Sequence, residues 1–120
     1  MASGDFVMMD QHGWIVKLYD VGATTAGNGP WVEVPVWFNV RSFFCDPTDN
    51  TNTIGADSVS IEAGNFATAP TASTSGLVVK TGLTGTTLGG TNVETYRWVR
   101  AVKTGTAKTV VVILTAARNE

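Results

Sequence analysis

Two strand-like stretches near the end of the chain constrain its fold more than any other feature of the sequence. They run from Glu94 to Lys103 and from Lys108 to Ala116, and both are rich in β-branched and aromatic residues. Such residues favour strands, and the short segment between them contains Gly105, which suits a tight turn. The pattern predicts a long hairpin at the centre of an all-β domain.

The two strands of this predicted hairpin differ in how clearly they show a buried face. Val110 to Leu114 is apolar at every position, which is typical of a strand covered on both sides. In the first strand, basic residues interrupt the apolar alternation at Arg97, Arg100 and Lys103. Two interpretations fit this strand: one face docks on a partner, or the basic side chains reach the rim of an ordinary sandwich core.

The segment from Trp31 to Arg41 shows the clearest two-residue alternation in the chain. One face carries Val32, Val34, Val36, Phe38 and Val40, and the other carries Trp31, Glu33, Pro35, Trp37 and Asn39. The alternation predicts a single strand with its valine face in the core. Pro35 cannot donate a ladder hydrogen bond, so it indicates an edge or a bulge.

Trp31 and Trp37 lie on the face of this strand that is turned away from the core. In one interpretation Tyr19 or a loop of the same chain covers them. In the other, the two tryptophans and Pro35 form a docking patch, because aromatic residues gather at the centres of interfaces.

The chain divides into an N-terminal segment, residues 1–13, and a β-sandwich domain, residues 14–120. The first is an arm or a first strand, and its apolar residues are further interface candidates because an arm needs a surface to lie on: Phe6, Met8 and Met9. Strands are also expected at residues 14–20, 58–63 and 77–80, while residues 81–92 are a loop or an irregular edge. The whole predicts a single-domain antiparallel β-sandwich, Ig-like or jelly-roll-like, with about seven strands.

Composition narrows the classes of function. The 120 residues are 43% hydrophobic and only 15% charged, which is typical of one sheet-rich domain. The net charge of −2 and the scattered basic residues argue against a nucleic-acid partner. No apolar run is long enough to cross a membrane, and the N-terminus lacks the features of a signal peptide. We therefore expect a soluble protein made in the cytoplasm, with no membrane partner.

The candidate catalytic residues do not form a recognisable constellation. The single cysteine, Cys45, follows two phenylalanines and is expected to be a buried thiol, and the single histidine, His12, has no evident partner. A glycosidase pair would need two of the strand glutamates Glu33, Glu62 and Glu94 to face each other, and surface positions are the simpler interpretation. We expect no catalytic activity and no cofactor.

A polar segment at residues 45–57 contains several side-chain oxygen donors. Its aspartates and asparagines could in principle hold calcium, but their spacing does not match an EF-hand loop and no glutamate closes it. Aspartate and asparagine are also the usual residues of turns. We therefore expect a loop and no metal site.

The last quarter of the chain has an aromatic and arginine-rich strand that leads into a valine-rich one. Its residues are Tyr96-Arg97-Trp98-Val99-Arg100-Ala101, a short turn, and Thr109-Val110-Val111-Val112-Ile113-Leu114-Thr115-Ala116. With the small size, low charge, loops rich in threonine and glycine and the lack of a cysteine pair, this arrangement resembles small β-sandwich virion proteins of tailed bacteriophages. The resemblance covers Val93 to Ala116 and is closest to head decoration, or cement, proteins.

The resemblance implies a protein of the outer surface of a virion head that stabilises the capsid lattice and has no catalytic residues. Its implied partners are the major capsid protein and copies of itself, in a homotrimer or another symmetric oligomer. Another phage structural subunit, from a tail tube or connector, is an alternative. A carbohydrate-binding module is a second, with Trp31, Trp37 and Tyr19 as a stacking platform for sugars. A small hydrolase is a third.

Overall fold

A computed structural model describes residues 6–9, 13–19, 26–35, 37–38, 40–47, 57–83, 88–92, 96–106 and 109–117 of the chain. At residues 6–9, 46–47, 80, 82–83 and 88–92 it describes the backbone alone. Within these ranges the chain forms strands and no helix. The ten strands are β1 (Phe6–Met9), β2 (Gly13–Tyr19), β3 (Gly27–Asn28), β4 (Val32–Glu33), β5 (Val40–Pro47), β6 (Ser58–Gly64), β7 (Leu77–Leu83), β8 (Leu88–Asn92), β9 (Trp98–Thr104) and β10 (Val110–Ala117).

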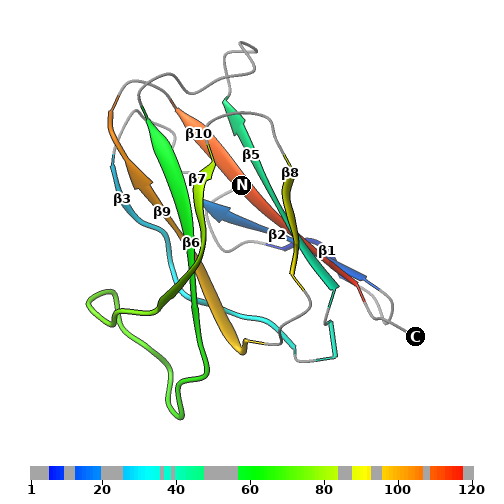
Figure 1. Ribbon diagram of the computed structural model, residues 1–120. Helices are drawn as coiled ribbons and strands as arrows, with labels where there is room; N and C mark the ends of the chain where they lie inside the picture. The colour runs from blue at the N-terminus through cyan, green and yellow to red at the C-terminus, as the bar shows by residue number, and fades with distance from the viewer. Residues whose placement is uncertain are drawn as a thin grey trace.

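The strands form two antiparallel sheets that pack face to face, which confirms the expected β-sandwich (Figure 1). One sheet has the order β1-β2-β10-β5-β8, and the other has the order β3-β9-β6-β7 with β4 also paired to β9. The strands outnumber the seven or so that were expected. Two of them, β3 and β4, are short strands of two residues, and β1 and β8 arise from segments that the sequence left open between strand and loop. No described helix is long and apolar enough to cross a bilayer.

The closing strands β9 and β10 do not form the predicted hairpin. β9 pairs with β6 in one sheet, while β10 lies between β2 and β5 in the other. The connection at Gly105, whose φ is 90°, therefore crosses from one sheet to the other. A tight turn reverses the chain in both arrangements, so turn chemistry alone could not separate them. The central position of the two strands is confirmed, since each lies inside its sheet.

The predicted single strand from Trp31 to Arg41 is also wrong. β4 ends at Glu33, and β5 begins at Val40 in the opposite sheet, so the segment between them crosses the lower end of the sandwich (Figure 1). The backbone amide of Phe38 donates to the carbonyl of Pro35 at 3.0 Å and closes a turn there. Strand pairing stops at Pro35 because proline cannot donate to a ladder.

Burial along this broken segment follows the predicted alternation up to the turn and then changes phase. Val32, Val34 and Phe38 are buried as expected, and Val36 and Asn39 lie outside the described residues. Val40 is only half-buried, because the buried residues of β5 are Arg41, Phe43 and Cys45. The alternation thus identified Val32, Val34 and Phe38 as buried without identifying the elements that carry them.

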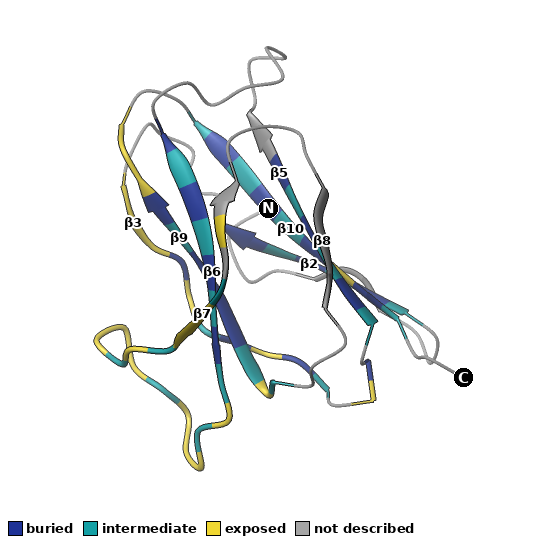
Figure 2. Cartoon of the chain, viewed as in Figure 1, coloured by how far each residue is buried: buried dark blue, intermediate teal, exposed yellow. Residues whose placement is uncertain are grey.

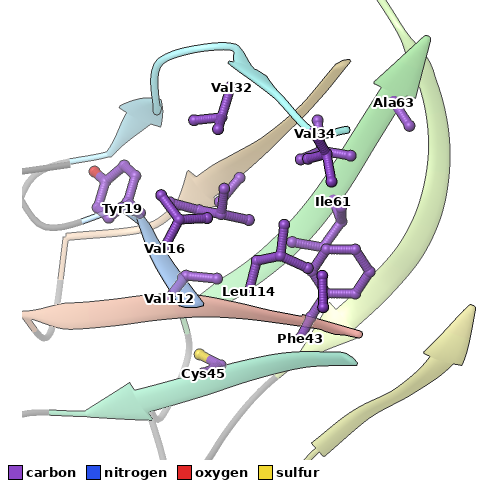
Figure 3. Packing of buried hydrophobic residues seen from close by; sticks show 14 of the residues in the cluster. Val16, Tyr19, Val32, Val34, Phe43, Cys45, Ile61, Ala63, Val112 and Leu114 are labelled. Carbon is purple, nitrogen blue, oxygen red and sulfur yellow. The ribbon is translucent and has the colours of Figure 1, made fainter. Parts of the chain in front are cut away.

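The core fills the space between the sheets with alternate residues of each strand (Figures 2 and 3). β6 buries the three residues that its alternation predicted, Val59, Ile61 and Ala63. Across the core, β2 buries Trp14, Val16 and Leu18, and β10 buries Val110, Val112 and Leu114. Burial of such side chains contributes about 1.5–3 kcal/mol each, so this layer supplies most of the driving force for the fold.

The last residues of β9 fix the crossing between the sheets with a buried ion pair. Lys103 points into the sandwich, and its Nζ lies 3.1 Å from Oδ2 of Asp57 and donates to the carbonyl of Gly105 at 2.7 Å. Both charged side chains are at most 2% exposed. Lys103 therefore does not reach the rim of the core, which was one of the two interpretations of the basic residues in this strand.

Candidate interaction surfaces

Trp37 presents a large aromatic surface to solvent from the turn that crosses the end of the sandwich. Trp37 is 54% exposed, and its ring is tilted against the ring of Phe38 with the two centroids 6.0 Å apart. Phe38 is buried and stacks on the core residue Trp14 at a centroid distance of 6.4 Å. Trp37 is therefore an exposed side chain on a firmly packed base, which is how an interface residue is presented.

Arg41 secures the same turn from inside. Its Nε donates to the carbonyl of Phe38 at 2.9 Å, and a second guanidinium nitrogen donates to the carbonyl of Tyr96. Burial lowers the pKa of Arg41 to about 10, so the side chain remains charged at neutral pH. The two carbonyl contacts join the crossing segment to the start of β9.

Trp31 lies against a loop of its own chain. The loop is residues 65–76, between β6 and β7, and its Phe66 meets Trp31 edge to face with the centroids 5.2 Å apart. A Cβ added to Gly76 would lie 2.6 Å from Cη2 of Trp31, so the loop backbone runs directly over the indole. A loop of the same chain therefore covers part of Trp31.

The other predicted interface residues take separate positions. Since the strand breaks at Pro35, Trp31 and Trp37 do not share one strand face, and Pro35 itself is half-buried at the start of the turn. Phe6, Met8 and Met9 lie in β1, which pairs with β2 at the edge of its sheet. The backbone of this segment is therefore a first strand, and the side chains lie outside the described part.

Arg100, Glu62 and Trp31 form a cluster on the outer side of β9 and β6, which we call the arginine clamp. The guanidinium of Arg100 donates to Oε1 of Glu62 at 2.9 Å and lies 4.6 Å from the centroid of the Trp31 ring. The side chain of Arg100 is 5% exposed and that of Glu62 is 16% exposed. The sequence indicated Arg100 as a basic interruption of a strand and did not predict that a loop would bury it.

The clamp also holds the loop at residues 65–76. A guanidinium nitrogen of Arg100 donates to the carbonyl of Ala72 at 3.0 Å, and the amide of Gly76 donates to the same Glu62 oxygen at 3.1 Å. One buried carboxylate thus joins the strand arginine to the end of the loop.

Leu77 and Val78, at the start of β7, are exposed aliphatic residues that the sequence analysis missed. Leu77 is 59% exposed and Val78 is 48% exposed, and β7 forms one edge of its sheet. The available signal was the apolar run Leu77-Val78-Val79 directly after a long polar loop. This run identifies a strand but does not tell which of its residues the rest of the chain covers.

The outer face of β10 forms a further apolar area. Val111 and Ile113 point away from the core and are half-buried, and Ile113 lies opposite Phe44 of β5 and Lys17 of β2. β10 was expected to be covered on both faces. In this chain its outer side chains are covered only in part.

The residues considered for catalysis or metal binding have structural contacts or lie outside the described residues. The thiol of Cys45 is fully buried, as expected. Glu33 pairs with Arg97 at 3.2 Å on the surface, and Glu62 belongs to the clamp. His12 and Glu94 are not among the described residues.

The acidic residues suggested as calcium donors lie largely outside the described part of the chain. The exception at the end of that segment, Asp57, is buried with Lys103. Within the described ranges, no group of three or more His, Cys, Asp or Glu residues is placed to hold a metal ion.

Comparison with known proteins found no family model, no curated protein and no solved structure that matches this chain. The likeness to phage virion proteins therefore stays a prediction from the sequence.

Proposed function

We propose that the chain is a structural protein of a tailed-phage virion, a capsid decoration protein that binds the outer head lattice and stabilises it. The observation that carries the proposal is the exposure of Trp37 on a packed turn at one end of the β-sandwich. Tryptophan is among the residues that contribute most to protein interfaces. Covering the exposed half of an indole would contribute about 2–3 kcal/mol at roughly 25 cal/mol per Å².

The low charge of the chain supports the same role. A protein that coats a lattice must bury part of its surface against neighbours, and each charge in such an interface must be desolvated. Only 15% of the residues are charged. Among the described residues, the buried cations Arg100 and Lys103 are paired with carboxylates within the chain, and the buried Arg41 donates to two backbone carbonyls. The surface that remains is therefore suited to broad, weakly charged contacts.

The half-covered outer face of β10 offers a second area for lattice contact. Ile113 and Phe44 are cross-strand neighbours there and form a small apolar pair, with Lys17 on the other side of Ile113. A tail-tube or connector subunit would use the same kinds of surface. That role remains the first alternative, and the particle to which the protein adds distinguishes it.

The carbohydrate-binding alternative has less support from the geometry. A stacking platform needs exposed, flat aromatic faces. Tyr19 is 2% exposed in the core, and Trp31 lies against Phe66 and Arg100. Of the three aromatic residues suggested for such a platform, Trp37 is the one with a large exposed surface.

The test is binding to empty heads assembled from the major capsid protein of the same virus. We expect wild-type protein to co-sediment with these heads and Trp37→Ala to bind about 30-fold more weakly, which corresponds to a loss of about 2 kcal/mol. Circular dichroism and thermal melting should be unchanged, since Trp37 is mostly outside the core. Thr106→Ala, at an exposed position next to Gly105 and outside both proposed contact areas, is the matched control and should bind normally.

Three outcomes would contradict this proposal. The wild-type protein fails to bind heads, Trp37→Ala binds as tightly as wild type, or Trp37→Ala unfolds and so identifies the residue as core. A saturable change of tryptophan fluorescence on glycan titration would support the sugar-binding module instead.

A further inference from the structure

The start of β7 has the sequence of a strand that is covered on both faces, yet this chain leaves both faces open. Leu77 lies opposite the fully buried Ala63, so it is on the core side of the sheet, and Val78 lies opposite Glu62 on the outer side. The two residues are 59% and 48% exposed. Consecutive apolar residues are typical of strands buried on both faces, whereas exposed edge strands usually alternate with polar residues or carry charge.

The loop that leads into this strand is long for a compact domain. Residues 65–76 extend below the sheet in Figure 1, and Figure 2 shows that much of this loop is exposed. Most connections in compact domains are about 4–6 residues long, and longer ones without secondary structure are often functional. The exposed strand residues and the exposed loop are continuous in sequence, so they form one surface, which we call the β7 surface (residues 65–78).

The loop is nevertheless fixed at several points along its length. At its start, Oδ1 of Asn65 accepts from the backbone amide of Arg97 at 2.7 Å. In its middle, the backbone amides of Thr71 and Thr74 are tied in a turn by hydrogen bonds of 3.0 Å. The arginine clamp holds its second half. A loop ordered in this way loses little further conformational entropy when it binds.

The composition of the clamp indicates that its role is to fix geometry. Nε of Arg100 and Nε1 of Trp31 are buried with no hydrogen-bond partner in the described part of the chain. A buried ion pair with unsatisfied groups is often no more stable than an apolar cluster of the same volume. The guanidinium instead places Ala72 and Glu62 in one defined arrangement, because it contacts each through a different nitrogen while it stacks on Trp31.

The β7 surface carries no charge. From Ala63 to Val79 there is no Asp, Glu, Lys, Arg or His, although 15% of the whole chain is charged. In a contact between two copies related by a two-fold axis, each surface meets its own kind, so charges near the axis would face like charges. A surface without charges avoids this repulsion, and this favours a second copy of the chain as the occupant.

We propose that the β7 surface is a self-association surface through which two copies of this chain pack about a two-fold axis. The proposal deepens the proposed function and rests on it for the expectation of a symmetric oligomer. Leu77 and Val78 provide the apolar centre, and the clamped loop provides the uncharged rim. A sugar ligand is less well matched, because Phe66 in the loop and Trp31 beside it contact each other edge to face.

The test is the oligomeric state of the purified full chain by sedimentation velocity over a wide range of concentration. We expect a reversible dimer that resists added salt, because no exposed ion pair holds it. Leu77→Asp places two carboxylates near the axis and should weaken the dimer at least tenfold. Thr115→Asp makes the same charge change at an exposed site on the other sheet and should leave the dimer intact. Val78→Asp is a second variant in case Leu77→Asp fails to fold.

The outcomes separate this proposal from the virion role. A protein that is monomeric at every concentration, or an oligomer that survives both aspartate variants, overturns the β7 surface as the contact between copies. If the oligomer survives Leu77→Asp while Trp37→Ala abolishes head binding, the virion role stands without this surface. A dimer lost in Leu77→Asp, from a protein that never binds heads, keeps the surface and rejects the virion role. If the wild type is monomeric and Leu77→Asp loses head binding or glycan binding, the β7 surface binds that other partner and not a second copy of the chain.

Discussion

Gly105 is the residue on which the crossing between the two sheets depends most directly. Its φ of 90° lies in the region that favours glycine, and a Cβ there would meet Oδ1 of Asp57 at 2.1 Å. That carboxylate is held by Lys103, so it has little freedom to move away. The absence of a side chain at Gly105 therefore allows the turn to pass directly against the buried ion pair.

We predict that Gly105→Ala destabilises the protein by about 2–4 kcal/mol, from backbone strain of about 1 kcal/mol plus the clash with a buried carboxylate. Urea unfolding followed by circular dichroism measures the loss. Gly27→Ala is the matched control, because Gly27 also has a positive φ, 146°, but nothing within 4 Å of its Cβ position. An equal loss in the two variants would show that the contact with Asp57 adds nothing beyond the backbone strain.

At the scale of single elements, the sequence predicted burial better than connection. The alternation in Val59, Ile61 and Ala63 gave a strand and its buried face correctly, because the period of a strand is a local property. The same reasoning wrongly predicted a single strand at residues 31–41 and a hairpin formed by β9 and β10. Both errors concern which sheet a strand joins, and that depends on contacts far apart in the chain.

The candidate surfaces show the same division. Exposure of Trp37 follows from its phase in the alternation and could be predicted. The partial burial of Trp31, at the same phase, required the loop of residues 65–76 to fold back over it. Apart from Phe66, the sequence of that loop is mostly small residues and does not predict such a contact. The arginine clamp could not be predicted either, since Glu62 and Arg100 come from strands whose pairing was unknown.

The arginine clamp makes a prediction at the scale of the element it holds. Arg100→Lys keeps the charge but loses the planar fork, so it cannot contact Ala72 and Glu62 together while stacking on Trp31. We expect amide hydrogen exchange at Gly76 to accelerate at least tenfold, with a loss of about 1–2 kcal/mol in overall stability. Nuclear magnetic resonance exchange measurements give both values.

The control for the clamp is Arg97→Lys, because Arg97 pairs with Glu33 on the surface, where the two side chains are 46% and 51% exposed. Exposed pairs contribute little, about 0–1 kcal/mol, so exchange in the loop should stay at the wild-type rate. Equal acceleration in both variants would indicate that the loop depends on the general stability of β9 and not on the clamp.

At the scale of the whole molecule, the surfaces available for contact lie on different parts of one β-sandwich. Trp37 lies at the turn that crosses its end, the β7 surface lies at an edge of one sheet, and the half-covered face of β10 belongs to the other sheet. A protein that bridges neighbours in a lattice needs separate contact areas of this kind, and it needs them held at fixed angles. The two packed sheets hold these areas at fixed angles only if the sandwich unfolds as one cooperative unit.

Cys45 allows this cooperativity to be measured. The thiol is fully buried on β5, among residues contributed by both sheets, so a thiol reagent reaches it only when the sheets separate (Figure 3). We expect its labelling rate in native buffer to be lower than that of the unfolded chain by the same factor as the unfolding equilibrium constant, about a thousandfold or more. The rate should rise with urea along the slope of global unfolding. Rapid labelling without urea, or a much shallower slope, would show that β5 opens locally, and a sandwich that opens there would not hold its outer surfaces at fixed angles.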